Sequence, residues 1–322
     1  MKTAIRAVIT AILLFPAFVN AADVTITRIS NGAGTKQFPD IYGDRVVWQD
    51  TRNGKADVYL YDIASGTETR ITQGGHDHKK PRIFGDRIYW QDYRNGVSDI
   101  YMYDLAEKKE KPVVVSPTQK IDLAVSERYL AWTDLGDGKG TVCLYDPATK
   151  REKRMTSGQA PQGFAALSAQ YLVWKDERND SGDIYLYDIA KGKEARITSN
   201  PEAQWSPAAY GNLVVWEDNR NKDVLPNYDI YLYDTATGKE RQLTRSDANQ
   251  RFPRVWGTRV VFVDNSRAEA EDIHLLDLVT GKETALTHGT TDYYTPAIYG
   301  DRVVFSDLKN IYLATLPAGG AR

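Results

Sequence analysis

The stretch from Trp48 to Asp62 reads WQDTRNGKADVYLYD, and the stretch from Trp90 to Asp104 reads WQDYRNGVSDIYMYD. The second is a near copy of the first, placed 42 residues later. Self-similarity at such a period is typical of chains built from repeated structural units, each of which needs its neighbours to bury its apolar faces. The repeat therefore indicates the organisation of the whole chain.

The repeat continues to the end of the sequence. A large aromatic residue recurs at spacings of 42, 42, 42, 42, 46 and 43, and an acid stands two residues after each one. In a chain of 322 residues this predicts seven units of about 43 residues. The aromatic residues are Trp48, Trp90, Trp132, Trp174, Trp216, Phe262 and Phe305, and the acids are Asp50, Asp92, Asp134, Asp176, Asp218, Asp264 and Asp307.

Each unit divides into four short strands. In the first unit we expect them near 38–42, 45–49, 57–61 and 68–72, separated by turn-forming residues such as Gly43-Asp44. No stretch has a convincing helical period. Four-stranded units at this spacing are typical of propeller blades, so the sequence predicts an all-β, seven-bladed propeller with antiparallel blades.

The third strand of each unit gives a physical reason for a ring. Its even positions are aliphatic and its odd positions are mostly Tyr, so both faces favour burial. A sheet stacked between two similar sheets buries both faces, and a closed ring leaves no end sheet exposed. The aliphatic residues are Val58, Ile100, Val142, Ile184, Ile230, Ile273 and Ile311.

The ring needs a closing strand. The seventh unit stops after its third strand, near 310–315. Residues 24–30, VTITRIS, resemble the fourth strand of the first unit, ETRIT at 68–72. We therefore expect residues 24–30 to pair with 310–315 and to complete the last blade, which also removes an exposed sheet edge.

The first residues predict export. Lys2 and Arg6 precede an apolar run at 7–19, and small residues lead to a cleavage site after Ala21. We interpret 1–21 as a signal peptide and 22–322 as one propeller domain. The apolar run contains Pro16 and is short for a membrane anchor, so no stable membrane insertion is expected after cleavage. The expected location is the periplasm, with the cell surface or exterior as the alternative.

The charge composition limits the classes of partner that we expect. The formal charge is −2, acids and bases are mixed along the whole chain, and no basic stripe appears. Nucleic acid is therefore not expected as a partner. The single cysteine, Cys143, cannot form an internal disulfide bond.

The repeat resembles that of TolB-type propellers. The resemblance rests on DTRNG at 50–54, DVYLYD at 57–62 and ETRIT at 68–72, and it recurs at 90–104, 174–188 and 216–234. It implies the propeller fold. TolB itself has six blades behind an N-terminal α/β domain, for which this chain has no room, so its envelope role is not implied. The hydrolase domain of propeller peptidases, with its Gly-x-Ser-x-Gly elbow, is also missing.

The repeated acids and the scattered histidines are the candidates for a metal site. Asp50 and its equivalents are followed by Arg two residues later in four units, which favours turns and ion pairs over calcium ligands. His76, His78 and His288 form a partial set resembling the metal ligands of oligogalacturonate lyase, a related propeller with several His and a Gln. Solvated loop histidines explain them better, so we predict neither a metal nor a cofactor.

A ring of polar side chains precedes the first strands. It occupies the third and second positions before the proline of each unit, or before its equivalents Leu123 and Ala165. The connecting loops of a propeller meet at one mouth of the channel. Long polar chains beside aromatic rings favour a polar ligand there, although a channel mouth is polar in any case. The residues that we predict to bind the ligand are Lys36, Gln37, His78, Lys79, Lys120, Gln162, Gln204, Trp205, Gln250, Arg251, Tyr293 and Tyr294.

Two features of the sequence depart from the repeat. The second-to-third strand loops at 219–229 and 265–272 are enlarged, which is typical of specificity-determining loops. Units three and four lack the Gly-Asp turn and instead have Glu127-Arg128 and Ala169-Gln170. This asymmetry marks either a partner-facing side or neutral drift.

The sequence favours a non-enzymatic binding or scaffold protein for a protein or glycan partner in the cell envelope, because no catalytic constellation emerges. The alternative is a polysaccharide-directed enzyme similar to oligogalacturonate lyase, with Lys36, His78, Lys79 or Arg251 near an acidic sugar. A self-associating surface protein is a third possibility.

Overall fold

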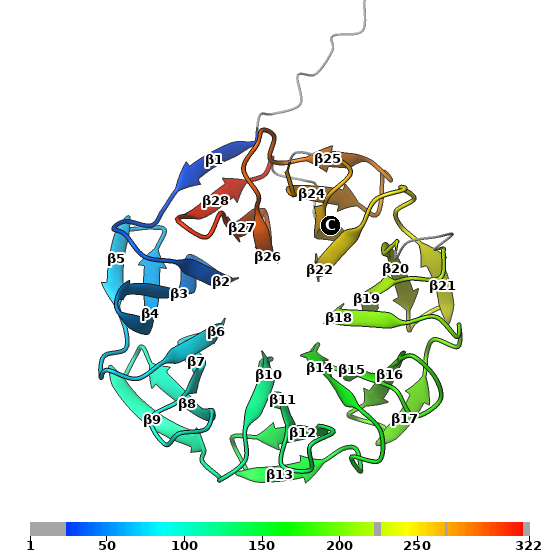
Figure 1. The fold of residues 1–322 in the computed structure, drawn as a ribbon, viewed down its shortest axis with the longest axis horizontal. Coiled ribbons are helices and arrows are strands. Elements are labelled where there is room, and N and C mark those ends of the chain that lie inside the picture. The colour runs from blue at the N-terminus through cyan, green and yellow to red at the C-terminus, as the bar shows by residue number, and fades with distance from the viewer. Residues whose placement is uncertain (1–23, 222–226, 268–269, 318–322) are drawn as a thin grey trace, which may run out of the picture.

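The computed structural model describes residues 24–221, 227–267 and 270–317. Seven four-stranded antiparallel sheets stand around a central axis like the blades of a wheel (Figure 1). The predicted seven-bladed, all-β propeller is confirmed. The signal peptide predicted at 1–21 lies outside the described residues, as do parts of the two enlarged loops.

Blades I to VII follow the order of the chain, and each begins with its innermost strand (Figure 1). Blades I to III consist of β2 (Lys36–Tyr42), β3 (Arg45–Asn53), β4 (Lys55–Asp62) and β5 (Thr67–Arg70); β6 (His78–Phe84), β7 (Arg87–Asp92), β8 (Asp99–Asp104) and β9 (Lys109–Val114); and β10 (Lys120–Val125), β11 (Leu130–Asp134), β12 (Thr141–Asp146) and β13 (Arg151–Arg154).

Blades IV to VI consist of β14 (Gln162–Leu167), β15 (Tyr171–Asp176), β16 (Asp183–Asp188) and β17 (Lys193–Arg196); β18 (Gln204–Tyr210), β19 (Leu213–Asp218), β20 (Asp229–Asp234) and β21 (Lys239–Gln242); and β22 (Gln250–Trp256), β23 (Arg259–Asp264), β24 (Asp272–Asp277) and β25 (Glu283–Ala285). Blade VII contains β26 (Tyr294–Tyr299), β27 (Arg302–Ser306), β28 (Ile311–Thr315) and, outermost, β1 (Thr25–Arg28).

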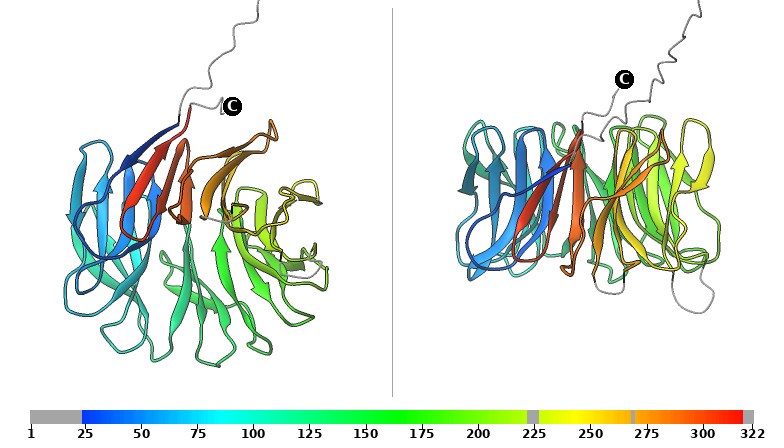
Figure 2. Two further views of the ribbon diagram at one scale, coloured as in Figure 1. Left: turned by 45° about the horizontal axis from the view of Figure 1, so that its top comes forward. Right: turned by 90° about the horizontal axis from the view of Figure 1, so that it is seen from above.

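The two ends of the propeller meet in blade VII. Strand β1 pairs antiparallel with β28, in the register that places Ile26 opposite Ala314. The pairing extends beyond the strands, because Ile29 N donates to Ile311 O at 2.9 Å and Ile311 N donates to Ser30 Oγ at 2.8 Å. The blade therefore combines the two ends of the propeller, as Figure 2 shows in blue and red.

The repeated aromatic residues form the core between blades. Trp48 is fully buried and packs with Ala297 and Val304 of blade VII, while Trp90 packs with Val47 and Val58 of blade I. Each such side chain contributes roughly 1.5–3 kcal/mol through burial. Both faces of every blade are therefore core faces, which is why the third strands are apolar at even positions and aromatic at odd ones.

The repeated acids hold the ends of the second strands. Asp50 accepts hydrogen bonds from Trp48 Nε1 at 3.1 Å and from Arg52 Nη2 at 2.5 Å, and the Arg52 guanidinium lies over Tyr59 at 4.2 Å. The same arrangement recurs in blades II, IV and V. The predicted pairing of acid and arginine is confirmed, and it fixes the blade architecture.

Every innermost strand contains a bulge that the sequence analysis did not predict. In each blade one non-glycine residue has a positive φ and interrupts the pairing with the second strand. Such an extra residue re-aims the side chains on either side of it. The residues are Phe38, Lys80, Asp122, Phe164, Ser206, Phe252 and Thr295, with φ between 48° and 56°.

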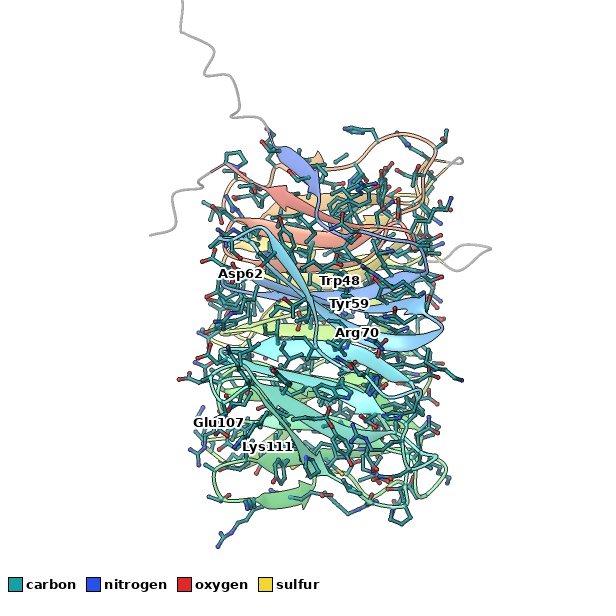
Figure 3. The ribbon with its side chains drawn as sticks, turned by 90° about the vertical axis from the view of Figure 1, so that its left-hand side faces the viewer. Trp48, Tyr59, Asp62, Arg70, Glu107 and Lys111 are labelled. Carbon is teal, nitrogen blue, oxygen red and sulfur yellow. The ribbon has the colours of Figure 1, made fainter. Side chains whose placement is uncertain are left out.

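The propeller has two distinct faces. We call the face with the first-to-second and third-to-fourth strand turns the turn face, and the opposite one the loop face. Asp62 and Glu107, which begin or lie in third-to-fourth turns of neighbouring blades, point to the same side in Figure 3. Within the described residues, no helix is long and apolar enough to span a membrane.

Candidate functional site in the central channel

The innermost strands of all seven blades line a cavity of about 680 Å³ along the propeller axis. Because side chains alternate along a strand, the residues after the bulge that face the axis form layers around the channel. The layer nearest the turn face is mostly aromatic, and the next layer further into the channel contains charged side chains.

At the turn face, five aromatic rings from consecutive blades form a continuous row, which we call the aromatic arc. Its members are Tyr210, Trp256, Tyr299, Tyr42 and Phe84, from blades V, VI, VII, I and II. Neighbouring ring centroids lie 4.4, 4.2, 4.9 and 4.5 Å apart in that order. All five rings are half-buried, so each keeps a surface toward the channel.

The circle of the arc is completed by small residues. Ser126 and Ser168 take the equivalent positions in blades III and IV. The rim therefore has an aromatic side and an open side. Flat amphipathic rings on one side of a concave mouth are well suited to pack against the face of a ring-shaped ligand.

Beneath the arc, the channel carries charge. Arg82 and Arg254 share this layer with Asp40, while alanines occupy it in the other blades. Arg82 Nη1 donates to Pro81 O at 3.0 Å, and Arg254 Nη1 donates to Pro253 O at 2.8 Å. Among the described residues, no carboxylate oxygen lies within 4.0 Å of a nitrogen of either guanidinium, so neither arginine forms an ion pair.

The pKa shifts reflect this uneven charge. Burial, and then the neighbouring Arg82 charge, lower the pKa of Arg254 to about 10. Burial also raises the pKa of Asp40, although Arg82 and a hydrogen bond of 2.9 Å from Ile83 N oppose the shift. In this layer two guanidinium groups face one weakened anion, whereas elsewhere the cavity lining contains Lys80 against Asp122 and Glu127. The positive charge is therefore local to this layer, where it favours an anionic group because guanidinium groups bind carboxylates in a bidentate fashion.

The twelve residues predicted to bind a ligand lie at the loop face, behind the channel. Lys36, His78, Lys120, Gln162, Gln204 and Gln250 are buried. Lys36 Nζ donates to Gly32 O and Ala33 O, each at 3.0 Å, and Lys120 Nζ donates to Asp99 at 3.2 Å. These side chains therefore hold the loops that enter each blade.

The remaining predicted residues are half-buried. Lys79 pairs with Asp77 at 2.9 Å, and Trp205 lies under Lys175 Nζ at 3.1 Å from its ring centroid. None of the twelve residues lines the channel cavity. The bulge explains this, because it separates them from the channel-facing positions by one extra residue. Ligand binding by this set stays a prediction. Gln37, Arg251, Tyr293 and Tyr294 are the other members of the half-buried group.

His76 and His78 come together with Asp92. Their Nε2 atoms each lie 3.6 Å from one oxygen of Asp92, and neither Nε2 has a hydrogen-bond partner in the described part of the chain. His78 Nδ1 lies 3.2 Å from Ala56 O and donates to it, which leaves Nε2 as the acceptor. Burial lowers the pKa of His78 and favours this neutral form. His288 is exposed and is not part of the cluster.

The Asp92 carboxylate of this cluster already accepts hydrogen bonds from other groups of the blade. Asp92 accepts hydrogen bonds from Trp90 Nε1 at 2.9 Å and from Arg94 through its backbone N at 3.0 Å, Nε at 2.8 Å and Nη2 at 2.7 Å. Four donors occupy the acceptor sites of a carboxylate, and a cation here would face the Arg94 guanidinium. We therefore interpret the cluster as polar packing and place the candidate site in the channel.

A signal for the aromatic arc was present in the sequence. The residue directly before the turn between the first two strands is aromatic in the five blades that form the arc. The twelve residues predicted to bind a ligand lie before the proline, or its equivalent, at the loop-face mouth, whereas the arc lies after it, at the turn-face mouth.

Several solved structures are similar to this chain over most of its length. Oligogalacturonate lyase from Vibrio parahaemolyticus has a TM-score of 0.70 and 14% sequence identity, covering 92% of this chain and 95% of that chain. The β-propeller domain of the Trilobed protease from Pyrococcus furiosus has a TM-score of 0.69 and 15% identity, covering 88% and 93%. TolB from Acinetobacter baumannii has a TM-score of 0.52 and 15% identity, covering 91% and 80%.

At these identities the likeness establishes the fold alone, and that fold is a TolB-like β-propeller. No protein-family model matches the sequence, and no curated protein is significantly similar to it. Any more specific function must therefore be argued from the channel itself.

Proposed function

We propose that this protein is a non-enzymatic binding protein of the cell envelope, exported by its N-terminal segment, which binds an acidic glycan at the turn-face mouth of the channel. The observation that carries the proposal is the aromatic arc above Arg82 and Arg254. Aromatic rings pack against the faces of sugar rings, and guanidinium groups pair with carboxylates. The cavity of about 680 Å³ is in the range of small-ligand pockets.

The glycan is favoured over a protein partner for geometric reasons. The charged layer lies beneath the rim, where a flat protein surface does not reach but a narrow ligand does. The structural similarity to oligogalacturonate lyase, whose name denotes an acidic oligosaccharide, agrees with this ligand class without establishing it.

An enzymatic function on the same ligand is the second candidate. It is favoured by Asp40, because a channel carboxylate with a raised pKa is suited to proton transfer. The sequence-based alternative of Lys36 or His78 as the catalytic group is less suitable, since both side chains are buried away from the cavity.

Calorimetric titration of residues 22–322 with a short uronic-acid oligosaccharide and with its neutral methyl ester tests the proposal. We expect binding of the acid only, weakened about tenfold or more in Arg82→Gln, since a charge-assisted hydrogen bond contributes about 1.5–3 kcal/mol. Arg241→Gln, on the exposed outer strand β21, is the matched control and should bind normally. Equal binding of acid and ester would contradict the proposal, and an unsaturated product that disappears in Asp40→Asn would favour the lyase.

A further inference from the structure

A second cavity lies beside the channel on the turn face, lined by residues of blades II, III and IV, with a volume of about 1010 Å³. We call it the side groove. Four residues line both cavities: Ser126, Glu127, Ala169 and Gln170. The side groove therefore opens into the channel mouth, at the side where Ser126 and Ser168 interrupt the aromatic arc.

We propose that the side groove is an extended subsite that holds further sugar units of a linear acidic oligosaccharide whose first units occupy the channel. This proposal rests on the proposed function and adds the length of the ligand and the direction in which it leaves the channel.

The repeat itself identifies the unusual feature of the side groove. In two blades an arginine at the start of the second strand pairs with the aspartate in the Gly-Asp turn of the next blade, whereas the equivalent Arg259 of blade VI donates to Gly300 O at 3.5 Å and to Pro317 O at 3.1 Å. Arg45 pairs in this way with Asp86, and Arg302 pairs with Asp44 at 2.5 Å. These contacts join neighbouring blades at the turn face.

Arg87 is the equivalent arginine of blade II, but the aspartate of the next turn is replaced by Arg128. The two positions that form an ion pair between blades VII and I and between blades I and II are thus both basic here, and Arg128 pairs with Asp146 of its own blade instead. Within the described residues, Arg87 has no carboxylate at ion-pairing distance. The lost ion pair leaves Arg87 as a cation without a carboxylate partner at the edge of the groove, and this change indicates a site for an external anion.

The other side chains of the groove agree with an acidic ligand. Four basic residues line it, Arg87, Lys111, Arg128 and Lys150, against one acid, Glu127, in a chain with a formal charge of −2. Part of this charge is paired at the groove edge. Arg128 lies 3.0 Å from Asp146, and Lys111 lies 2.7 Å from Glu107, as Figure 3 shows for the latter pair.

Three tyrosines, Tyr89, Tyr129 and Tyr145, line the groove together with these bases. The Arg128 guanidinium lies over the Tyr129 ring at 5.0 Å, so base and ring share one surface. This combination repeats the chemistry of the channel, where rings and guanidinium groups occur together. It suits a polymer in which every unit has both a ring and a carboxylate.

An acidic peptide fits the side groove less well. Extended peptides gain affinity by pairing with an exposed strand edge. The outer strand that borders the groove, β9, contains Pro112, which removes a backbone donor from that edge. The groove is otherwise built from turns and side chains, which contact sugar rings without strand pairing.

Titration with uronic-acid oligosaccharides of increasing length tests the inference. We expect the wild-type affinity to rise about tenfold once the chain is long enough to leave the channel, as one desolvated charge pair provides. Arg128→Asp restores the regular contact with Arg87, and it should abolish this gain while leaving the shortest ligand unaffected. Lys150→Glu, an exposed substitution, provides a second test if the turn variant folds poorly.

Arg151→Asp, on the exposed outer strand β13 of the same blade, makes the same change of charge outside the groove and should keep the gain. If no acidic oligosaccharide of any length binds, the proposed function fails. If short and long ligands bind alike, or if Arg128→Asp keeps the gain, the extended subsite is refuted while the channel site remains. A poly-glutamate peptide that binds in an Arg128-dependent way, in place of the glycan, would also refute it.

Discussion

Arg254→Gln should stabilise the fold and weaken ligand binding at the same time. Arg254 is half-buried in the channel beside Arg82, and this environment lowers its pKa from 12.5 to about 10. Because the folded-state pKa lies below the ordinary value, the charged side chain destabilises the fold at every pH below about 10. The penalty fades as the pH rises through that value.

The size of the effect follows from the pKa values. At about 1.4 kcal/mol for each pH unit, the difference between 12.5 and about 10 sets an upper limit of about 3.5 kcal/mol. The channel is open to solvent at its mouth, and solvent screening reduces this figure. We therefore expect Arg254→Gln to gain about 1–2 kcal/mol at neutral pH, and to bind a short acidic oligosaccharide about tenfold more weakly.

Urea unfolding monitored by tryptophan fluorescence measures the stability, and calorimetric titration of the same samples measures the binding. Arg254→Lys keeps a positive charge and is the matched control, for which we expect no comparable gain. The gain of the Gln variant should shrink above about pH 10. A destabilised Gln variant, or one that binds the oligosaccharide as tightly as the wild type, would refute the reasoning about uncompensated charge in the channel.

Three further outcomes follow from other parts of the structure. Trp256→Ala removes the second of the five rings of the aromatic arc, and calorimetric titration should show a loss of affinity of about tenfold. The unfolding midpoint should also fall, because the ring packs against the core between blades VI and VII. An unchanged affinity in the folded variant would exclude the arc from the site. Deletion of residues 24–30 removes β1 and exposes the edge of β28. Calorimetric scans should therefore show a lower melting temperature, and light scattering should show self-association of the variant. A variant as stable and monomeric as the full domain would contradict this. Burial lowers the pKa of His78, so its contribution to the free energy of unfolding should be fully present above its ordinary pKa of 6.5 and should fall as the pH drops below that value. In urea titrations at several pH values, His78→Gln should lose this pH dependence. An unchanged acid sensitivity in that variant would assign the effect to other groups.

The sequence predicts the fold well because the residue pattern of one blade recurs seven times. Trp48 and its equivalents mark the second strands, and the alternation around Val58 shows that both faces of a blade are buried. The partnership of Asp50 with Arg52 follows from their spacing alone. Local patterns suffice here because each contact recurs between neighbouring blades.

The site was less accessible to sequence reasoning for a specific geometric reason. The bulge at Phe38 and its equivalents inserts a residue with a positive φ, which no alternation pattern reveals. It separates Lys36, which is buried behind the channel, from Asp40, which faces it. Counting along a regular strand therefore does not identify which side chains face the channel cavity.

The internal repeat also provides a way to separate structural residues from functional ones without relatives. A residue that recurs in the same contact in several blades, such as Asp92 with Arg94, is explained by the architecture, even when histidines lie beside it. A residue that breaks a contact made in other blades requires another explanation. Arg128 opposite Arg87 is such a break, and it lies where the aromatic arc opens. If Arg128→Asp raised stability without affecting any ligand, neutral drift would explain the break, and this use of the repeat would lose its support.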